Sequence, residues 1–229
     1  MRYLAFLLLL FALPSVAQPG SAAPAQASVR FSFDWPQGYP WQSYLIDVQS
    51  TGQTAFNGTP HADETNDTDP YQQDFIMSEA NRQKIFELAQ KLNYFQGDFD
   101  SHLKHVAQTG KKTLQYQSPQ TRGSTTYNWS QNADVQELTK VFEAIAMTID
   151  YGRKLAFQYR FDKLGMNQRM KELEDLQSRG DAQELQVIAP ILQKIANDPN
   201  IMNISRESAH RLLQAIGQAD VAAQNPGAE

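Results

Sequence analysis

The sequence predicts an α+β fold: an antiparallel sheet of about five strands, covered on one face by helices and followed by an α-helical C-terminal region. Apolar and polar residues alternate with period two in the first part of the chain, a pattern typical of strands buried on one face. Two amphipathic helical segments interrupt and follow these strands, and beyond residue 153 the strand patterns stop. The two helices are therefore expected to lie on the apolar face of the sheet.

The first predicted strand spans residues 27–35. Val29, Phe31, Phe33 and Trp35 share one face of this strand, and polar side chains occupy the other. An exposed row of four such side chains would be costly in water, so this face requires a cover.

The following segments predict a hairpin and the helix that covers it. Residues 43–49 alternate in the same way, and residues 54–57 return after a turn in which Gly52 can take a positive φ. Ser78 is a favoured N-cap residue for the next helix. The apolar stripe of this helix consists of Ile85, Leu88, Ala89 and Leu92.

A second set of strands and a second helix are predicted downstream. Residues 106–114 repeat the Val-x-x-Thr-Gly pattern of residues 48–56, which predicts another hairpin, and Gly152 is expected to end the second helix. The order hairpin, helix, hairpin, strand, helix is either a weak internal duplication or convergence on common turn chemistry. The expected same-face residues are Lys112, Leu114 and Tyr116, then Thr125, Tyr127 and Trp129, and in the helix Val135, Leu138, Phe142, Ile145 and Ile149.

Residues 153–217 predict a helical extension. A long helix is expected to be interrupted near Gly165 and to end at Gly180, and Asp181 with Glu184 forms a predicted N-terminal capping pair. The expected core stripes of the long helix are Phe157, Phe161 and Leu164, then Met166, Met170 and Leu173.

The end of this extension, residues 188–217, resembles a single HEAT-type helical hairpin. Pro190 is expected to kink its first helix, Asn197-Asp198-Pro199 forms the turn, and Gly217 follows the second helix. The hairpin departs from the HEAT pattern by one residue after Ile204. Since a solenoid needs about three or more repeats, the hairpin is interpreted as a buttress of the main domain.

The N-terminus predicts export. Residues 1–17 combine Arg2, an apolar run and the small residues Ser15-Val16-Ala17, which is the pattern of a cleaved secretory signal peptide. The complete domain prediction is a signal peptide at 1–17, a disordered leader at 18–26, an α+β domain at 27–152, a helical extension at 153–217 and a disordered tail at 218–229. The protein is thus expected in the periplasm or outside the cell.

Composition excludes several classes of function. The chain has 229 residues, no cysteine and a formal net charge of −5, and its basic residues are dispersed. Disulfides are therefore ruled out, nucleic-acid binding is not expected, and no segment after the signal is predicted to span a membrane.

Three groups of residues are candidate sites. Trp35, Tyr39 and Trp41 surround a turn at 37–40, where aromatic rings either bind a partner or close the end of the core. The other two groups are acidic: Asp63, Glu64, Asp67 and Asp69 form either a calcium-binding or a solvated loop, and Asp98, Asp100, His102 and His105 are possible metal ligands. Neither acidic group has the spacing of a known metal motif, so no cofactor is predicted.

Five short motifs carry a resemblance to a known family. They are Phe33-Asp34-Trp35, Phe75-Ile76-Met77-Ser78, Thr109-Gly110-Lys111-Lys112, Tyr127-Asn128-Trp129-Ser130 and Tyr151-Gly152-Arg153. Together they resemble a family of uncharacterised exported proteins of environmental bacteria. The resemblance implies export and a shared fold, and it implies no activity.

The sequence therefore predicts a non-enzymatic binding or scaffold module for a protein or peptide partner. It contains no nucleophile elbow, no glycine-rich phosphate loop and no paired metal motif. The alternative is a metal-dependent hydrolase that uses Asp98, Asp100, His102 and His105.

Overall fold

The structure is a computed structural model, which describes residues 26–35, 40–63, 65, 68–104 and 107–224. One sheet of six strands has the order β4-β3-β2-β1-β5-β6, and every neighbouring pair is antiparallel. The strands are β1 (Ser28–Asp34), β2 (Trp41–Gln49), β3 (Gln53–Pro60), β4 (Tyr71–Ile76), β5 (Lys111–Gln117) and β6 (Arg122–Tyr127). The predicted α+β class and antiparallel sheet are confirmed.

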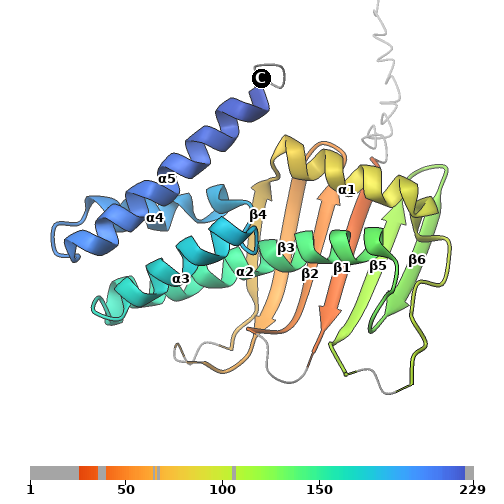
Figure 1. The fold of residues 1–229 in the computed structure, drawn as a ribbon, viewed down its shortest axis with the longest axis horizontal. Coiled ribbons are helices and arrows are strands. Elements are labelled where there is room, and N and C mark those ends of the chain that lie inside the picture. The colour runs from red at the N-terminus through yellow and green to blue at the C-terminus, as the bar shows by residue number, and fades with distance from the viewer. Residues whose placement is uncertain (1–25, 36–39, 64, 66–67, 105–106, 225–229) are drawn as a thin grey trace, which may run out of the picture.

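Two helices lie across the same face of this sheet, α1 (Glu79–Lys91) and α2 (Ala133–Phe161), as Figure 1 shows. Beneath them, Phe31 of β1 is fully buried, and its ring stacks on that of Phe142 of α2 with centroids 4.9 Å apart. Ile46 and Ile85 belong to the same buried cluster. The predicted core between the apolar face and the helices is therefore confirmed.

Strand β1 lies in the middle of the sheet, between strands β2–β4 and the hairpin of β5 and β6. It pairs with β2 on one side and with β5 on the other, in a continuous register over its whole length. The predicted turn between β2 and β3 is confirmed, and Gly52 there has φ +89°. The sequence pattern did not predict β4, because its inward positions Tyr71, Gln73 and Phe75 include a polar side chain and are only half-buried.

The predicted hairpin within residues 106–114 is wrong. Residues 107–110 are irregular, and the strand begins only at Lys111, after Gly110 with φ +92°. A single hairpin of β5 and β6 follows α1 and the short helix η1 (Asn93–Phe95), whereas four strands precede α1. The predicted element order is therefore also wrong, and the parts before and after α1 do not match as repeats.

Helix α2 does not end at Gly152, contrary to the prediction. It is 29 residues long, and its second half extends past β4 to the helical part of the molecule (Figure 1). A Cβ atom at Gly152 would lie 2.3 Å from Cγ2 of Ile188. Gly152 therefore permits close packing inside a helix and is not a stop signal.

The C-terminal region consists of α3 (Met166–Arg179), the short helix η2 (Leu185–Ile188), α4 (Ala189–Asn197) and α5 (Asn203–Gln224). The predicted break near Gly165 and the predicted helix end at Gly180 are confirmed, and Gly180 forms a left-handed C-cap with φ +73°. The predicted kink at Pro190 is wrong, because this residue lies in the first turn of α4, where a proline removes no helical hydrogen bond. Helix α5 also continues beyond Gly217.

Glu184 does not form the predicted capping pair with Asp181. Instead its carboxylate accepts hydrogen bonds from the backbone N–H of Ser78 at 2.8 Å, from the Ser78 hydroxyl at 2.6 Å and from the Asn81 amide at 2.5 Å. The carboxylate thus lies at the N-terminus of α1, where a helix favours negative charge. This contact ties the C-terminal region to the helix that covers the sheet.

Phe161 and Leu164 are not in the core, contrary to the predicted stripe. Their exposed fractions are 72% and 78%, whereas Met166 and Met170 of the second predicted stripe are fully buried. No helix in the described ranges is both long enough and apolar enough to cross a membrane.

Candidate binding pocket

The predicted metal group forms a surface loop. His102 Nε2 lies 2.7 Å from Asp98 Oδ2, and both side chains are largely exposed. Asp100 accepts hydrogen bonds from the backbone N–H groups of His102 and Asn128, so it organises the loop. His105 lies outside the described residues, and among those described no group of three or more His, Cys, Asp or Glu side chains is arranged to hold a metal ion. The pair with Asp98 raises the pKa of His102.

At Asp63 the acidic loop is not solvated, which corrects the solvated-loop alternative at this residue. The Asp63 side chain is only 15% exposed and pairs with Arg153 of α2. Arg153 also lies 3.0 Å from the buried Asp150, and it donates to the Thr65 hydroxyl at 2.7 Å. Of the other candidate calcium ligands, Glu64 and Asp67 lie outside the described residues. Asp63 thus fastens the loop to α2.

The three predicted aromatic binding residues have different environments. Trp41 is fully buried and donates its indole N–H to the Ala146 carbonyl at 3.0 Å, so it closes the end of the core. Tyr39 lies outside the described residues. Trp35, at the end of β1, is half-buried and lines a pocket.

This pocket, called the aromatic pocket below, has a volume of about 330 Å³. It lies where the ends of β1, β5 and β6 meet the N-terminal half of α2, and it is bounded by the rings of Phe33, Trp35, Tyr127 and Trp129. Phe33 and Trp35 meet edge to face with centroids 6.2 Å apart, and Trp129 is 40% exposed. The pocket is at the lower end of the range of about 300–1,000 Å³ that is typical of ligand sites.

Lys112 enters the pocket from β5. Its side chain is 6% exposed, and Nζ lies 2.8 Å from the Thr109 carbonyl, 3.2 Å from the Thr109 hydroxyl and 3.4 Å from the Asn128 carbonyl. The ammonium group also lies 5.3 Å from the centre of the Phe33 ring. Burial lowers the pKa of Lys112, and the nearby Glu143 partly opposes this effect.

Glu143 enters the pocket from α2. Its carboxylate lies 4.0 Å from Lys112 Nζ, and its side chain is 30% exposed. Burial raises the pKa of Glu143, and the charge of Lys112 opposes that shift. Among its described residues, the pocket therefore combines aromatic walls with the cations of Lys112 and Lys140 and the carboxylate of Glu143.

Tyr127 of β6 also lines the pocket, and in the strand register it is the partner of Lys112. Its hydroxyl lies 2.5 Å from that of Thr139, which in turn donates to the Val135 carbonyl at 2.7 Å. Burial raises the pKa of Tyr127, so its hydroxyl stays protonated at neutral pH.

No protein-family model matches the chain, and no curated protein is significantly similar to it in sequence.

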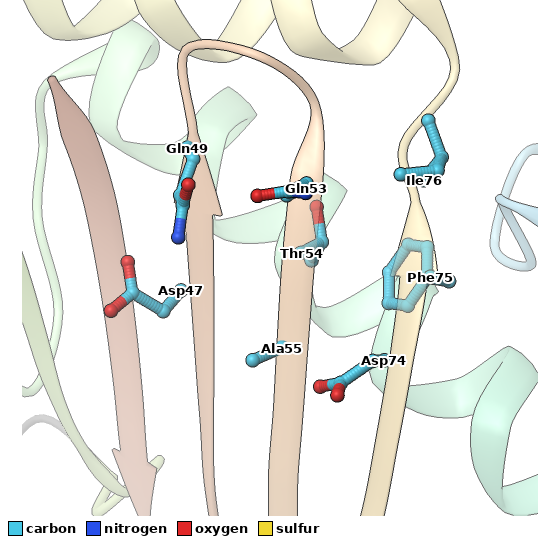
Figure 2. Close-up of a pocket in the computed structure, with 8 residues that line it drawn as sticks. All are labelled: Asp47, Gln49, Gln53, Thr54, Ala55, Asp74, Phe75 and Ile76. Atoms are coloured by element: carbon cyan, nitrogen blue, oxygen red, sulfur yellow. The ribbon is translucent and has the colours of Figure 1, made fainter. Parts of the chain in front are cut away.

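A second hollow lies on the sheet face opposite the helices and is shown in Figure 2. In the strand register Ala55 of β3 faces Asp47 on one side and Asp74 on the other, so the small side chain lies between two carboxylates. Asp47 is paired with Arg30 of β1. This hollow has a volume of about 590 Å³, but it lacks the cluster of rings that bounds the aromatic pocket. The aromatic pocket is therefore the better candidate site.

Sequence reasoning placed Trp35 in a candidate site but missed Lys112, Glu143 and Trp129. The position of Lys112 on the apolar face of its strand, together with Leu114 and Tyr116, was the available signal, since a lysine there has to find a buried partner. The partner could not be identified from the sequence, because Glu143 lies on α2 and Lys112 on β5, with β6 between them in the chain.

Proposed function

We propose that this protein is an exported, non-enzymatic binding module that holds a protein or peptide partner at the aromatic pocket. The supporting observation is the cluster of rings around Lys112 and Glu143, with Trp129 accessible at 40% exposure. Tryptophan and tyrosine are enriched among the residues that dominate binding energy at protein interfaces. The small volume of the pocket suits a single side chain of a partner better than a large cofactor.

The chemistry of the pocket favours binding over catalysis. Lys112 is engaged by three oxygen atoms, and a protonated Tyr127 is not a base at neutral pH. Among the described residues that line the pocket there is also no His or Cys, so these residues do not provide a nucleophile activated by histidine.

Capture of partners from the envelope fraction tests this proposal. The Trp129→Ala variant is expected to lose a partner that the wild type retains, because the accessible ring of the pocket is removed. Phe161→Ala is the matched control, since Phe161 is an exposed aromatic residue of the helical region. Equal capture by the wild type and both variants would overturn the proposal.

Export is tested separately by N-terminal sequencing of the mature protein from the producing cell. Cleavage after Ala17 is expected, with Gln18 as the first residue of the exported chain. A protein that retains Met1 and remains in the cytoplasm would contradict export without bearing on the pocket.

The alternative, a metal-dependent hydrolase, rests on the 2.7 Å contact between His102 and Asp98. Metal analysis of the purified wild type and of a His102→Ala/His105→Ala variant distinguishes the two functions. Stoichiometric zinc that is lost in the variant would favour the hydrolase over the binding module.

A further inference from the structure

The Glu143 carboxylate has unused hydrogen-bonding capacity. Within the described residues its one polar contact is the 4.0 Å approach of Lys112 Nζ, which is too long for a hydrogen bond. A carboxylate can accept about four hydrogen bonds. Gln136, which also lines the pocket, uses its amide N–H₂ on the Ser130 carbonyl at 2.7 Å, so its amide oxygen is a further acceptor.

The buried cation of the pocket is, in contrast, engaged, whereas Lys140 at the rim is largely exposed. The ammonium group of Lys112 has three donors and three oxygen atoms within 3.4 Å. Lys140, the other lysine of the lining, lies 3.4 Å from Asp181. Inside the pocket an anionic ligand would therefore meet the Glu143 carboxylate, while the donors of the buried Lys112 are already used.

The aromatic walls of the pocket favour a cationic ligand, as the acceptor oxygens of Glu143 and Gln136 do. The faces of aromatic rings attract cations, and tryptophan does so most strongly. Lys112 over the Phe33 ring is an example within this pocket. Trp35 and Trp129 provide further ring surface around the remaining volume.

We infer that the aromatic pocket binds a cationic side chain of the partner, with Glu143 as its counter-ion and the tryptophan rings as its walls. This inference rests on the proposed function. Arginine fits better than lysine, because a planar guanidinium group stacks on aromatic rings and forms two parallel hydrogen bonds with a carboxylate. Lys112 keeps its own oxygen ligands when the partner's cation binds.

Titration of the whole mature chain with three small probes tests the ligand class. The probes are N-acetyl-arginine methylamide, the neutral citrulline analogue of the same shape and N-acetyl-glutamate methylamide, followed by tryptophan fluorescence and by NMR. The arginine probe is expected to bind with a dissociation constant of about 1 mM, the affinity of a small fragment. The citrulline and glutamate probes are expected to bind at least about tenfold more weakly.

Glu143→Gln is the decisive variant, and Glu137→Gln is its matched control on the same helix, where the side chain pairs with Lys84 outside the pocket. Glu143→Gln is expected to weaken arginine binding about ten- to hundredfold, because a charge-assisted hydrogen bond is lost. Glu137→Gln is expected to bind like the wild type. Should Glu143→Gln fail to fold, Trp129→Ala, at an exposed position, provides the second test with the same expected loss.

Failure of this inference and failure of the proposed function give different results. Equal binding of the arginine and citrulline probes, or unchanged arginine binding in the pocket variants, would overturn the cationic ligand. If Trp129→Ala still abolished partner capture in that case, the proposed function would stand. Partner capture that is unaffected by Trp129→Ala would instead overturn the proposed function itself.

Discussion

Lys112 and Glu143 illustrate how two residues determine the character of a site. Each is a charged side chain on a core-facing position, and each would be costly to bury alone. Lys112 is stabilised by the Thr109 and Asn128 oxygens, so Glu143 does not have to satisfy it. Glu143 consequently has the less favourable environment of the two, and burial raises its pKa.

Glu143→Gln is therefore expected to change the pH dependence of stability. Since the pKa of Glu143 in the folded state lies above its ordinary value of 4.5, the folded protein holds this proton more tightly than the unfolded chain does. The contribution of Glu143 to the free energy of unfolding is greatest below pH 4.5 and declines as pH rises through the folded-state pKa. The variant lacks this decline, so its stability relative to the wild type, measured by urea unfolding, increases as the pH rises above 4.5.

Glu137→Gln is the control of opposite sign. Lys84 lowers the pKa of Glu137, so the wild-type contribution of this exposed residue is present above pH 4.5 and is lost at lower pH. The relative stability of Glu137→Gln should decline slightly with rising pH. A relative stability of Glu143→Gln that stays constant or declines over the same range would contradict the prediction.

Helices α2 and α5 show that a glycine inside a helix can be either required by packing or unnecessary. Both helices contain an internal glycine, which lowers helix propensity by about 1 kcal/mol relative to alanine. Gly152 lies against Ile188, whereas a Cβ atom at Gly217 would meet no described atom within 4 Å outside its chain neighbours and the backbone of its own helix. The first glycine is required by packing, and the second is not.

Gly152→Ala is expected to destabilise the protein by about 1–3 kcal/mol, because the overpacking against Ile188 outweighs the gain in helix propensity. Gly217→Ala is the matched substitution and is expected to stabilise the protein by up to about 1 kcal/mol. Both changes are measured by chemical denaturation. Destabilisation by Gly217→Ala, or stabilisation by Gly152→Ala, would refute the assigned packing.

The sequence could predict features that depend on neighbouring residues, and it could not predict features that depend on contacts with distant residues. Period-two patterns identified the strand of Phe31 and Phe33, because burial on one face is a local property. The local signals at Gly152 and Pro190 were misread, since their meaning depends on Ile188 and on where α4 begins. The pocket could be predicted only in part, because Trp35, Lys112 and Glu143 come from three separate elements.

The molecule has two buried apolar clusters, one between the sheet and its covering helices and one in the C-terminal helical region, and they are connected at a few residues. The sheet cluster includes Val187, and the helical cluster includes the next residue, Ile188. Helix α2, about 43 Å long at 1.5 Å per residue, contributes to both clusters. Glu184 adds a polar connection, since its carboxylate is bound by Ser78 and Asn81 of the α1 N-terminus.

Glu184→Ala is therefore expected to loosen the helical region from the sheet. The change leaves the backbone N–H of Ser78 without its acceptor and removes a carboxylate from the N-terminus of α1, at a cost of about 2–3 kcal/mol. In native-state hydrogen exchange, the amides of α4 and α5 should lose more protection than those of β1 and β2, because the sheet cluster keeps its own apolar core. Asp181→Ala is the nearby control and should cost less than about 1 kcal/mol, since the pairs of Asp181 with Arg179 and Lys140 are exposed. Equal loss of protection in both clusters would mean that they unfold as one unit, with Glu184 contributing to overall stability and not to their connection.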